Sequence, residues 1–199
     1  MKTLILLLTL TSSIFALSIN DSLLKVHATL VPKIYLMDYK FKDKLKNNTI
    51  TIAIMYKDNE YQDAKRLKGL IKHKYENGIK SYNVDPILVN YKNIKTAEAN
   101  IYYLLPAKSK EIIKVVQKAA TNDALTFAYL RDDLEHGVMI SLNVSKKIKP
   151  LLNLTAIKTH NIALRPVLID ISAIYTKDLG SSLDHLNMRG FNFYRVFQA

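Results

Sequence analysis

Residues Ile50 to Gly78 read ITIAIMYKDNEYQDAKRLKGLIKHKYENG, and the prediction of the fold rests mainly on this segment. Its start alternates isoleucine and tyrosine with threonine, alanine and methionine, which predicts a buried strand over Ile50 to Tyr56. A lysine-rich amphipathic helix is expected next, from about Glu60 to Tyr75, with Gly78 as its left-handed terminator. The apolar stripe of this helix consists of Ala64, Leu67, Leu70 and Ile71. A buried strand followed by such a helix is one unit of a parallel, helix-covered sheet.

The same alternation extends in both directions from this unit. Upstream, Asp21 or Ser22 can cap a helix that Pro32 should bend or restart. Downstream, a helix capped by Ser109 lies between short apolar runs that we interpret as strands: Val84 to Val89, Ile101 to Leu105, Leu125 to Leu130 and Val138 to Val144. Pro86 places the first of these runs at a sheet edge. The sequence therefore predicts one α/β domain with a mainly parallel sheet covered by helices.

The last third of this domain should close it with two helices. Leu152-Asn153-Leu154 leads into a short helix over Thr155 to His160, which Asn161 can end because asparagine tolerates positive φ. Pro166 suits the first turn of a second helix. Apolar residues then recur at helical spacing and should dock this helix on the sheet: Val167, Leu168, Ile171, Ile174 and Tyr175.

The first residues are typical of a secretory signal peptide. Lys2 precedes an apolar centre over Leu4 to Leu10, and Ala16 offers a small residue for cleavage. A membrane anchor is the alternative, but this run is shorter than the roughly 20 apolar residues that a span requires. We therefore expect a signal peptide over 1–16, the α/β domain over 17–176, a tail over 177–199 and a periplasmic location.

Composition limits the partners. The chain has 199 residues, a net charge of +12 and no cysteine, so no disulfide contributes to stability. A basic protein can bind nucleic acid, but only five of the basic residues are arginine and the lysines are scattered. We expect no specific nucleic-acid binding, whereas attraction to acidic envelope polymers or lipid head groups remains open.

No catalytic or metal-binding set stands out, so we expect neither enzymatic activity nor a cofactor. The histidines are isolated and show no metal-ligand spacing: His27, His73, His136, His160 and His185. Asp132, Asp133 and Glu135 do crowd one turn, beside His136, and could contact a cation or a cationic partner. The alternative is a solvated turn whose aspartates bond nearby amides.

From Leu125 to Tyr175 the chain reads LTFAYLRDDLEHGVMISLNVSKKIKPLLNLTAIKTHNIALRPVLIDISAIY, and this string resembles the YfiR family of periplasmic proteins. In that family a strand precedes a glycine, a strand pair, an INL-AA helix start and a closing LL-LA helix. The matching residues, which are mainly structural, are Gly137, Leu152, Asn153, Leu154, Ala156, Leu168 and Ile171. The less specific part of the resemblance extends back to residue 21.

Three positions depart from the family pattern. Met37-Asp38-Tyr39 stands where members often have Trp-Pro, His136-Gly137 where they often have two glycines, and His160-Asn161 where they have Ala-Gly. Some members also carry disulfides proposed to tune activity with redox state. Since this chain has no cysteine, redox control is not transferred to it.

The resemblance implies a regulatory binding protein, because the family's namesake looks like a periplasmic inhibitor of an inner-membrane diguanylate cyclase. Related members occur with other membrane receptors, so a sensor kinase is also a candidate partner. The rival hypothesis is a single-lobed solute-binding or sensor component of a transport system, with a small-molecule ligand at the carboxyl ends of the strands. A homodimer is left open. The aromatic tail residues Phe191, Phe193 and Tyr194 suggest a docking segment, although a last strand is the alternative.

Overall fold

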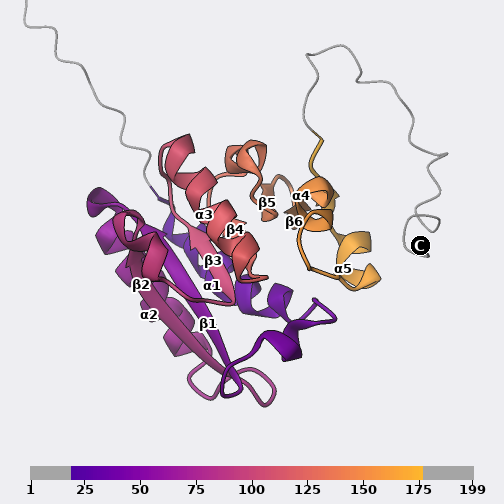
Figure 1. Cartoon of the computed structure of the whole chain (residues 1–199), viewed down its shortest axis with the longest axis horizontal. Coiled ribbons are helices and arrows are strands. Elements are labelled where there is room, and N and C mark those ends of the chain that lie inside the picture. The colour runs from indigo at the N-terminus through magenta and orange to yellow at the C-terminus, as the bar shows by residue number, and fades with distance from the viewer. Residues whose placement is uncertain (1–18, 177–199) are drawn as a thin grey trace, which may run out of the picture.

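The computed structural model describes residues 19–176, which form one seven-stranded sheet with helices on both faces (Figure 1). The strand order is β2-β1-β3-β4-β5-β6-β7. Neighbouring strands from β2 to β5 run parallel, β6 is antiparallel to β5, and β7 is parallel to β6. The strands are β1 Thr49–Tyr56, β2 Asn83–Asn90, β3 Ile101–Leu104, β4 Leu125–Ala128, β5 Ile140–Val144, β6 Ile148–Leu152 and β7 Ala173–Ile174. The predicted fold class, a single α/β domain with a mainly parallel sheet, is confirmed.

Within residues 19–176, five α-helices and four short 3-10 turns connect these strands. The helices are α1 Asp21–Tyr35, α2 Tyr61–Lys74, α3 Ser109–Thr121, α4 Leu154–Lys158 and α5 Pro166–Ile171. The turns are η1 Phe41–Lys44, η2 Asp58–Glu60, η3 Tyr91–Thr96 and η4 Arg131–His136. No helix in this described range is both long and apolar enough to cross a bilayer.

The interior strand β1, which lies between β2 and β3, is buried on both faces, as its continuous apolar sequence predicts. Ile50, Ile52 and Ile54 face the core cluster that includes α1 and α2, whereas Ala53 and Met55 face the cluster that includes α3. Figure 1 shows α3 on the opposite side of the sheet from α1 and α2. Because each face is covered, strands with apolar residues at nearly every position are stable here.

Pro86 lies in β2, which pairs only with β1 and forms one edge of the described sheet. Proline lacks the N–H that a second neighbour would need, so the predicted edge placement is confirmed. Gly78 also adopts the expected left-handed backbone, with φ of +73°. A β-carbon on Gly78 would collide with the carbonyl oxygen of Tyr82, so a larger residue would not fit.

The last third departs from the prediction in its details. The final helix was expected to reach Tyr175 but ends at Ile171, and Ala173–Ile174 pair with β6 instead. Ser172 is extended, and the Tyr175 N–H donates to the Leu152 carbonyl at 2.8 Å. For Ala173 and Ile174, pairing with the free edge of β6 is therefore more favourable than continuing helix α5. The strand β6 itself was not predicted from periodicity.

Helix ends also differ from the expected caps. Asn20 caps α1 through its side chain, and Lys108 stands at the N-cap of α3, one residue before Ser109. Asn161 is not among the residues with positive φ, so its predicted role in ending α4 is wrong. Its side chain serves another purpose, described below. The predicted signal peptide and the aromatic tail lie outside the described residues.

Candidate functional site

The turn η4, which carries the crowded carboxylates, follows β4 at the carboxyl edge of the sheet. Gly137 ends the turn with φ of +90°, a backbone that a residue with a side chain rarely adopts. Burial separates the acidic residues: Asp133 is 5% exposed, whereas Asp132 and Glu135 are exposed. Among residues 19–176, no group of three or more histidines and carboxylates could hold a metal ion.

Asp133 is the most perturbed carboxyl group of this turn. Its Oδ2 atom is buried and accepts no hydrogen bond from any described residue. Burial, helped by the nearby charge of Asp132, raises the pKa of Asp133 to about 7. The side chain is therefore poised between its neutral and charged forms near neutral pH.

A pocket of about 440 Å³ opens where α4 packs against η4. The Asn153 side chain joins the two walls, because its Nδ2 donates to the Leu134 carbonyl at 2.9 Å while its Oδ1 accepts from the Ala156 N–H at 3.0 Å. This one residue both caps α4 and fixes the helix to the turn. The pocket is lined by Val116, Leu134, Glu135, Gly137, Asn153, Thr155, Ala156, Thr159, His160 and Tyr175.

His160 contributes an imidazole to this pocket. Its Nδ1 lies 2.6 Å from the Ala156 carbonyl, a contact in which the ring must donate. In the neutral ring, Nε2 is then an acceptor, and that atom is buried with no partner among the described residues. His160 and Glu135, whose side chains can both accept hydrogen bonds, are thus among the residues that line a largely apolar pocket. This arrangement suits recognition of a group that donates hydrogen bonds.

The crevice where a sheet of this order usually binds small ligands is filled by the chain itself. In such sheets the ligand lies beyond the carboxyl ends of the strands, at the point where the order reverses. Here that point lies between β1 and β3. Tyr91, which follows β2, is 6% exposed and reaches past β1 to donate to the Leu105 carbonyl at 2.6 Å. Lys57, after β1, pairs with Glu111 of α3 at 3.9 Å beside it.

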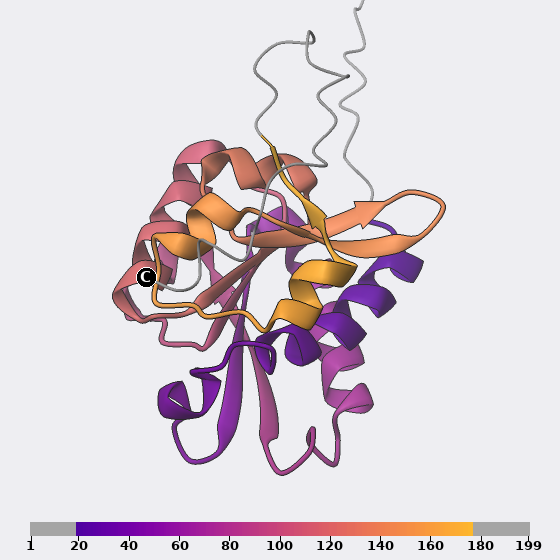
Figure 2. The same cartoon turned by 90° about the vertical axis from the view of Figure 1, so that its right-hand side faces the viewer.

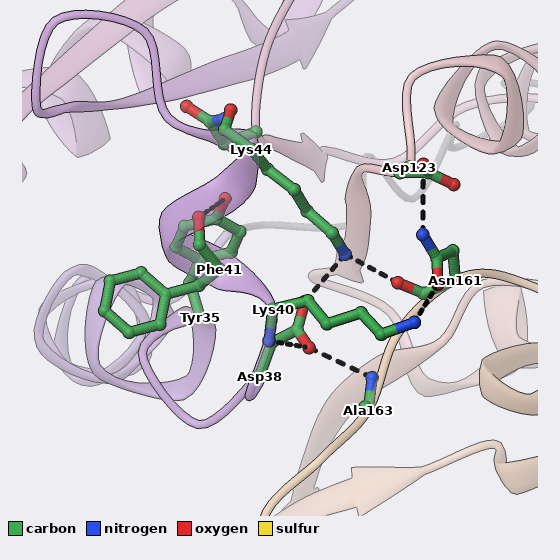
Figure 3. A network of polar contacts seen from close by, with 9 residues as sticks. Tyr35, Asp38, Lys40, Phe41, Lys44, Asp123, Asn161 and Ala163 are labelled. Atoms are coloured by element: carbon green, nitrogen blue, oxygen red, sulfur yellow. Dashed lines mark hydrogen bonds and ion pairs between the residues drawn. The ribbon is translucent and has the colours of Figure 1, made fainter.

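A buried ion pair lies next to the loop that follows α4, in the network of Figure 3. Asp38 is 1% exposed and its Oδ2 accepts from the Lys44 Nζ at 2.7 Å, while its Oδ1 accepts from the backbone N–H groups of Lys40 and Ala163. Lys44 also donates to the Asn161 carbonyl at 2.7 Å. We call Asp38, Lys44 and Asn161 the clamp. It fastens the loop after α4 to the segment after α1.

The clamp joins two of the three places where the sequence departs from the family pattern. The Tyr39 N–H donates to the Ala163 carbonyl at 2.8 Å, and the Arg165 guanidinium lies over the Tyr39 ring, 4.9 Å from its centre. The Asn161 side chain accepts from Lys40 at 2.6 Å and donates to Asp123 at 3.3 Å. Asp38 and Asn161 thus act together, although 123 positions of sequence separate them.

The structure brings some of the residues singled out from sequence together and scatters others. Glu135, Gly137, Asn153 and Ala156 line the pocket. Leu152 and Leu168 are core residues, and Leu154 packs partly buried against the same core. Ile171 is 55% exposed, so its expected core role is wrong. Phe191, Phe193 and Tyr194 lie outside the described residues.

Sequence reasoning missed the rest of the pocket and the whole clamp. Thr155, Thr159 and Tyr175 carry no motif, and His160 was set aside as an isolated histidine. The only early signal for the clamp was the departure from the family pattern at Asp38 and Asn161. Tyr91 gave no signal, because nothing in a strand's sequence tells which tyrosine will fill a crevice.

The fold is similar to that of one solved structure, and a second structure matches more weakly. A conserved domain protein from Vibrio cholerae O1 biovar El Tor matches with a TM-score of 0.55 and 14% identity, over 77% of this chain and 60% of that chain. An ABC domain from Streptococcus pneumoniae in complex with L-Trp matches with a TM-score of 0.47 and 11% identity, over 71% of this chain and 61% of that chain. This chain therefore spans about 60% of the length of either structure. No protein-family model matches the sequence, and no curated protein is significantly similar to it. The likeness concerns the fold alone.

Proposed function

We propose that this chain is a non-enzymatic, periplasmic regulatory protein that binds an inner-membrane receptor, such as a diguanylate cyclase or a sensor kinase. The resemblance of residues 125–175 to the YfiR family supports this class of function. The observation that carries the proposal is the pocket between η4 and α4, because its largely apolar wall carries a few polar side chains that can recognise a group of a partner.

The filled crevice at the end of β1 favours a partner over a small substrate. A ligand at that point would have to displace Tyr91 and break its bond to the Leu105 carbonyl. The pocket, by contrast, is open and lies beside the exposed carboxylates Asp132 and Glu135. An apolar depression with acidic groups next to it suits a side chain of a partner protein that ends in hydrogen-bond donors.

The mechanism is a shift of a binding equilibrium. The regulator would bind one state of the receptor more tightly than the other, and an envelope cue would change that difference. The wall of the pocket is the short helix α4, which is held by Asn153 at its start and by the clamp after its end. A partner side chain in the pocket would therefore affect both the Asn153 contact at the start of α4 and the clamp after its end.

Site-specific photo-crosslinking tests the proposal. A photoreactive residue is placed at Thr155, which is exposed on the pocket wall, and a matched one at Lys72, which is exposed on α2. After mixing with envelope membranes, we expect a crosslink to a membrane receptor from position 155 and none from position 72. Equal crosslinking from both positions, or none from position 155, would refute a partner site at this pocket.

A second candidate function is a single-lobed solute-binding or sensor domain. The cavity of about 440 Å³ favours it, because small-molecule sites have volumes of about 300–1,000 Å³. Native mass spectrometry of the protein purified from cells separates the two functions. A small molecule that is bound to the parent chain and lost in Thr155→Trp would favour the solute-binding function. If neither the parent chain nor the variant carries a small molecule, receptor binding is favoured.

A further inference from the structure

The hairpin of β5 and β6 ends in a tip of exposed residues. All residues from Val144 to Lys149 are exposed, whereas Leu142 and Pro150 at the base of the hairpin are buried. Figure 2 shows the tip projecting from the body of the domain. The hairpin is thus anchored by its base and free at its end.

Two of the exposed side chains are aliphatic and lie directly opposite each other. Val144 is 57% exposed, Ile148 is 42% exposed, and the two are register partners. Leu142 and Pro150, the next pair on the same face, are buried in the domain. The apolar face of the hairpin therefore continues past the core into solvent.

The charges around this pair have a single sign. Lys146 and Lys147 form the turn and Lys149 follows Ile148. None of the three forms an ion pair with an acidic residue in the described part of the chain. From Gly137 to Ile169 the sequence contains no aspartate or glutamate, so no carboxylate close along the chain neutralises the tip.

We propose that this tip docks on an anionic phospholipid bilayer, with Val144 and Ile148 entering the boundary of the acyl chains and the lysines lying among the lipid phosphates. Aliphatic residues flanked by lysines suit this environment, since each lysine near an anionic surface strengthens attraction and its long stem can reach the head groups. Protein interfaces instead favour aromatic residues and arginine and are depleted in lysine. The tip contains neither an aromatic residue nor an arginine.

This inference goes beyond the proposed function, because it assigns a lipid surface and concerns a different part of the molecule. Such docking would hold the domain at the membrane that contains its proposed receptor. Binding through one hairpin tip is weak and reversible, and it should weaken as salt screens the lysines.

Co-sedimentation with vesicles tests the inference, using the chain without its expected leader. We expect binding to phosphatidylglycerol–phosphatidylcholine vesicles and none to phosphatidylcholine alone. Lys146→Glu with Lys147→Glu should lower the partition coefficient by more than about tenfold, because each lysine contributes about fivefold. The control, Lys65→Glu with Lys72→Glu, makes the same charge change on exposed positions of α2 and should retain most of the binding. Equal losses in both variants, or no binding of the parent chain, would overturn the assignment.

A fluorescent probe separates insertion from charge attraction. The chain contains no tryptophan, so Ile148→Trp places its single indole at the tip. Anionic vesicles should shift its emission to the blue and protect it from iodide, while Tyr39→Trp, on another exposed site, should change little. An unshifted emission of the Ile148→Trp variant while it is bound to vesicles would contradict insertion. Neither result depends on crosslinking from Thr155, so the proposed function can fail independently.

Discussion

Asp133 shows what burial does to a single carboxyl group. The sequence presents it as one of several acidic residues in a polar turn, and the structure puts it alone under that turn with an unpartnered oxygen. Sequence pattern predicted the cluster correctly as a turn. The pattern could not tell which acidic residue would point into the protein. Each position of a short 3-10 turn points in a different direction around the turn, and the sequence does not say which direction faces the core.

Asp133→Asn should stabilise the fold at high pH. A carboxyl whose folded pKa is raised to about 7 contributes full stability below its ordinary pKa, and this is lost as pH rises through 7. The variant should match the parent near pH 4 and exceed it by about 2–4 kcal/mol in unfolding free energy near pH 8, at about 1.4 kcal/mol per pKa unit. Denaturant unfolding from pH 4 to 8 measures this. Asp132→Asn removes only the neighbouring charge, which is the smaller cause of the raised pKa, so its gain in unfolding free energy with pH should be smaller; equal gains in both variants would contradict the assignment.

His27 acts in the opposite direction. It is fully buried, its Nδ1 lies 2.8 Å from the Tyr103 hydroxyl, and burial lowers the pKa of His27 to about 3. Since only the unfolded chain takes up a proton between pH 6.5 and 3, stability is complete above 6.5 and falls as the solution is acidified. Its ring also packs edge-on against Phe127.

The double variant His27→Phe with Tyr103→Phe should remove this acid sensitivity. His27→Phe alone leaves the Tyr103 hydroxyl unpaired and should cost about 1–3 kcal/mol, much of which the second change restores. Thermal unfolding at pH 7 and pH 4.5 is the measurement. Should the double variant lose as much stability on acidification as the parent, another group must carry the effect.

At the scale of elements, the clamp decides how the closing segment attaches. Asp38→Ala would leave Lys44, which is 10% exposed, without its carboxylate and would free two backbone N–H groups. Removing one partner of a buried ion pair typically costs about 3–5 kcal/mol. Urea unfolding should show this loss, whereas Glu98→Gln, which removes the exposed pair with Lys46, should leave the midpoint nearly unchanged. Equal effects would show that the clamp adds no more stability than a surface pair.

The helices and strands with strong hydrophobic periodicity were predictable from sequence, whereas the elements at the end of the described chain, from β6 to β7, were predictable only in part. The strand at Ile50, the helix after it and the edge strand with Pro86 follow from local pattern, because each buries a face that its own sequence defines. Helix α5 was predicted too long, since Ile174 continues the helical spacing but pairs with β6. The free edge of β6 is a tertiary feature that local spacing does not contain. For the same reason Asn161 was interpreted as a helix end when its contacts lie across the chain.

For the whole molecule, the described residues form a core of their own. Leu168 of α5 is 3% exposed and closes that core near residue 176. Truncation at Ser181 should therefore leave the unfolding transition unchanged while weakening partner binding through the aromatic tail. Circular dichroism and membrane capture measure the two effects. Loss of folded protein on truncation would contradict the docking role of the tail.

The pocket was partly predictable at this scale. Gly137, Asn153 and Ala156 came from the family resemblance and Glu135 from the crowded turn, yet nothing in the sequence placed Asn153 and Ala156 against the turn that holds Glu135 and Gly137. Their meeting depends on the Asn153 bond to Leu134 and on the path of the β5–β6 hairpin between them. Contacts between residues so far apart in sequence can be identified only once the folded structure is known.

The most direct test of the regulatory proposal is affinity capture from envelope membranes of the native organism, with the chain from Leu17 onward as bait and mass spectrometry of what it retains. Thr155→Trp, which should block the pocket, is the matched control. We expect the parent chain to retain a membrane diguanylate cyclase or sensor kinase and the blocked variant to retain neither. Retention of transporter subunits, or equal retention of a receptor by both baits, would contradict the regulatory proposal.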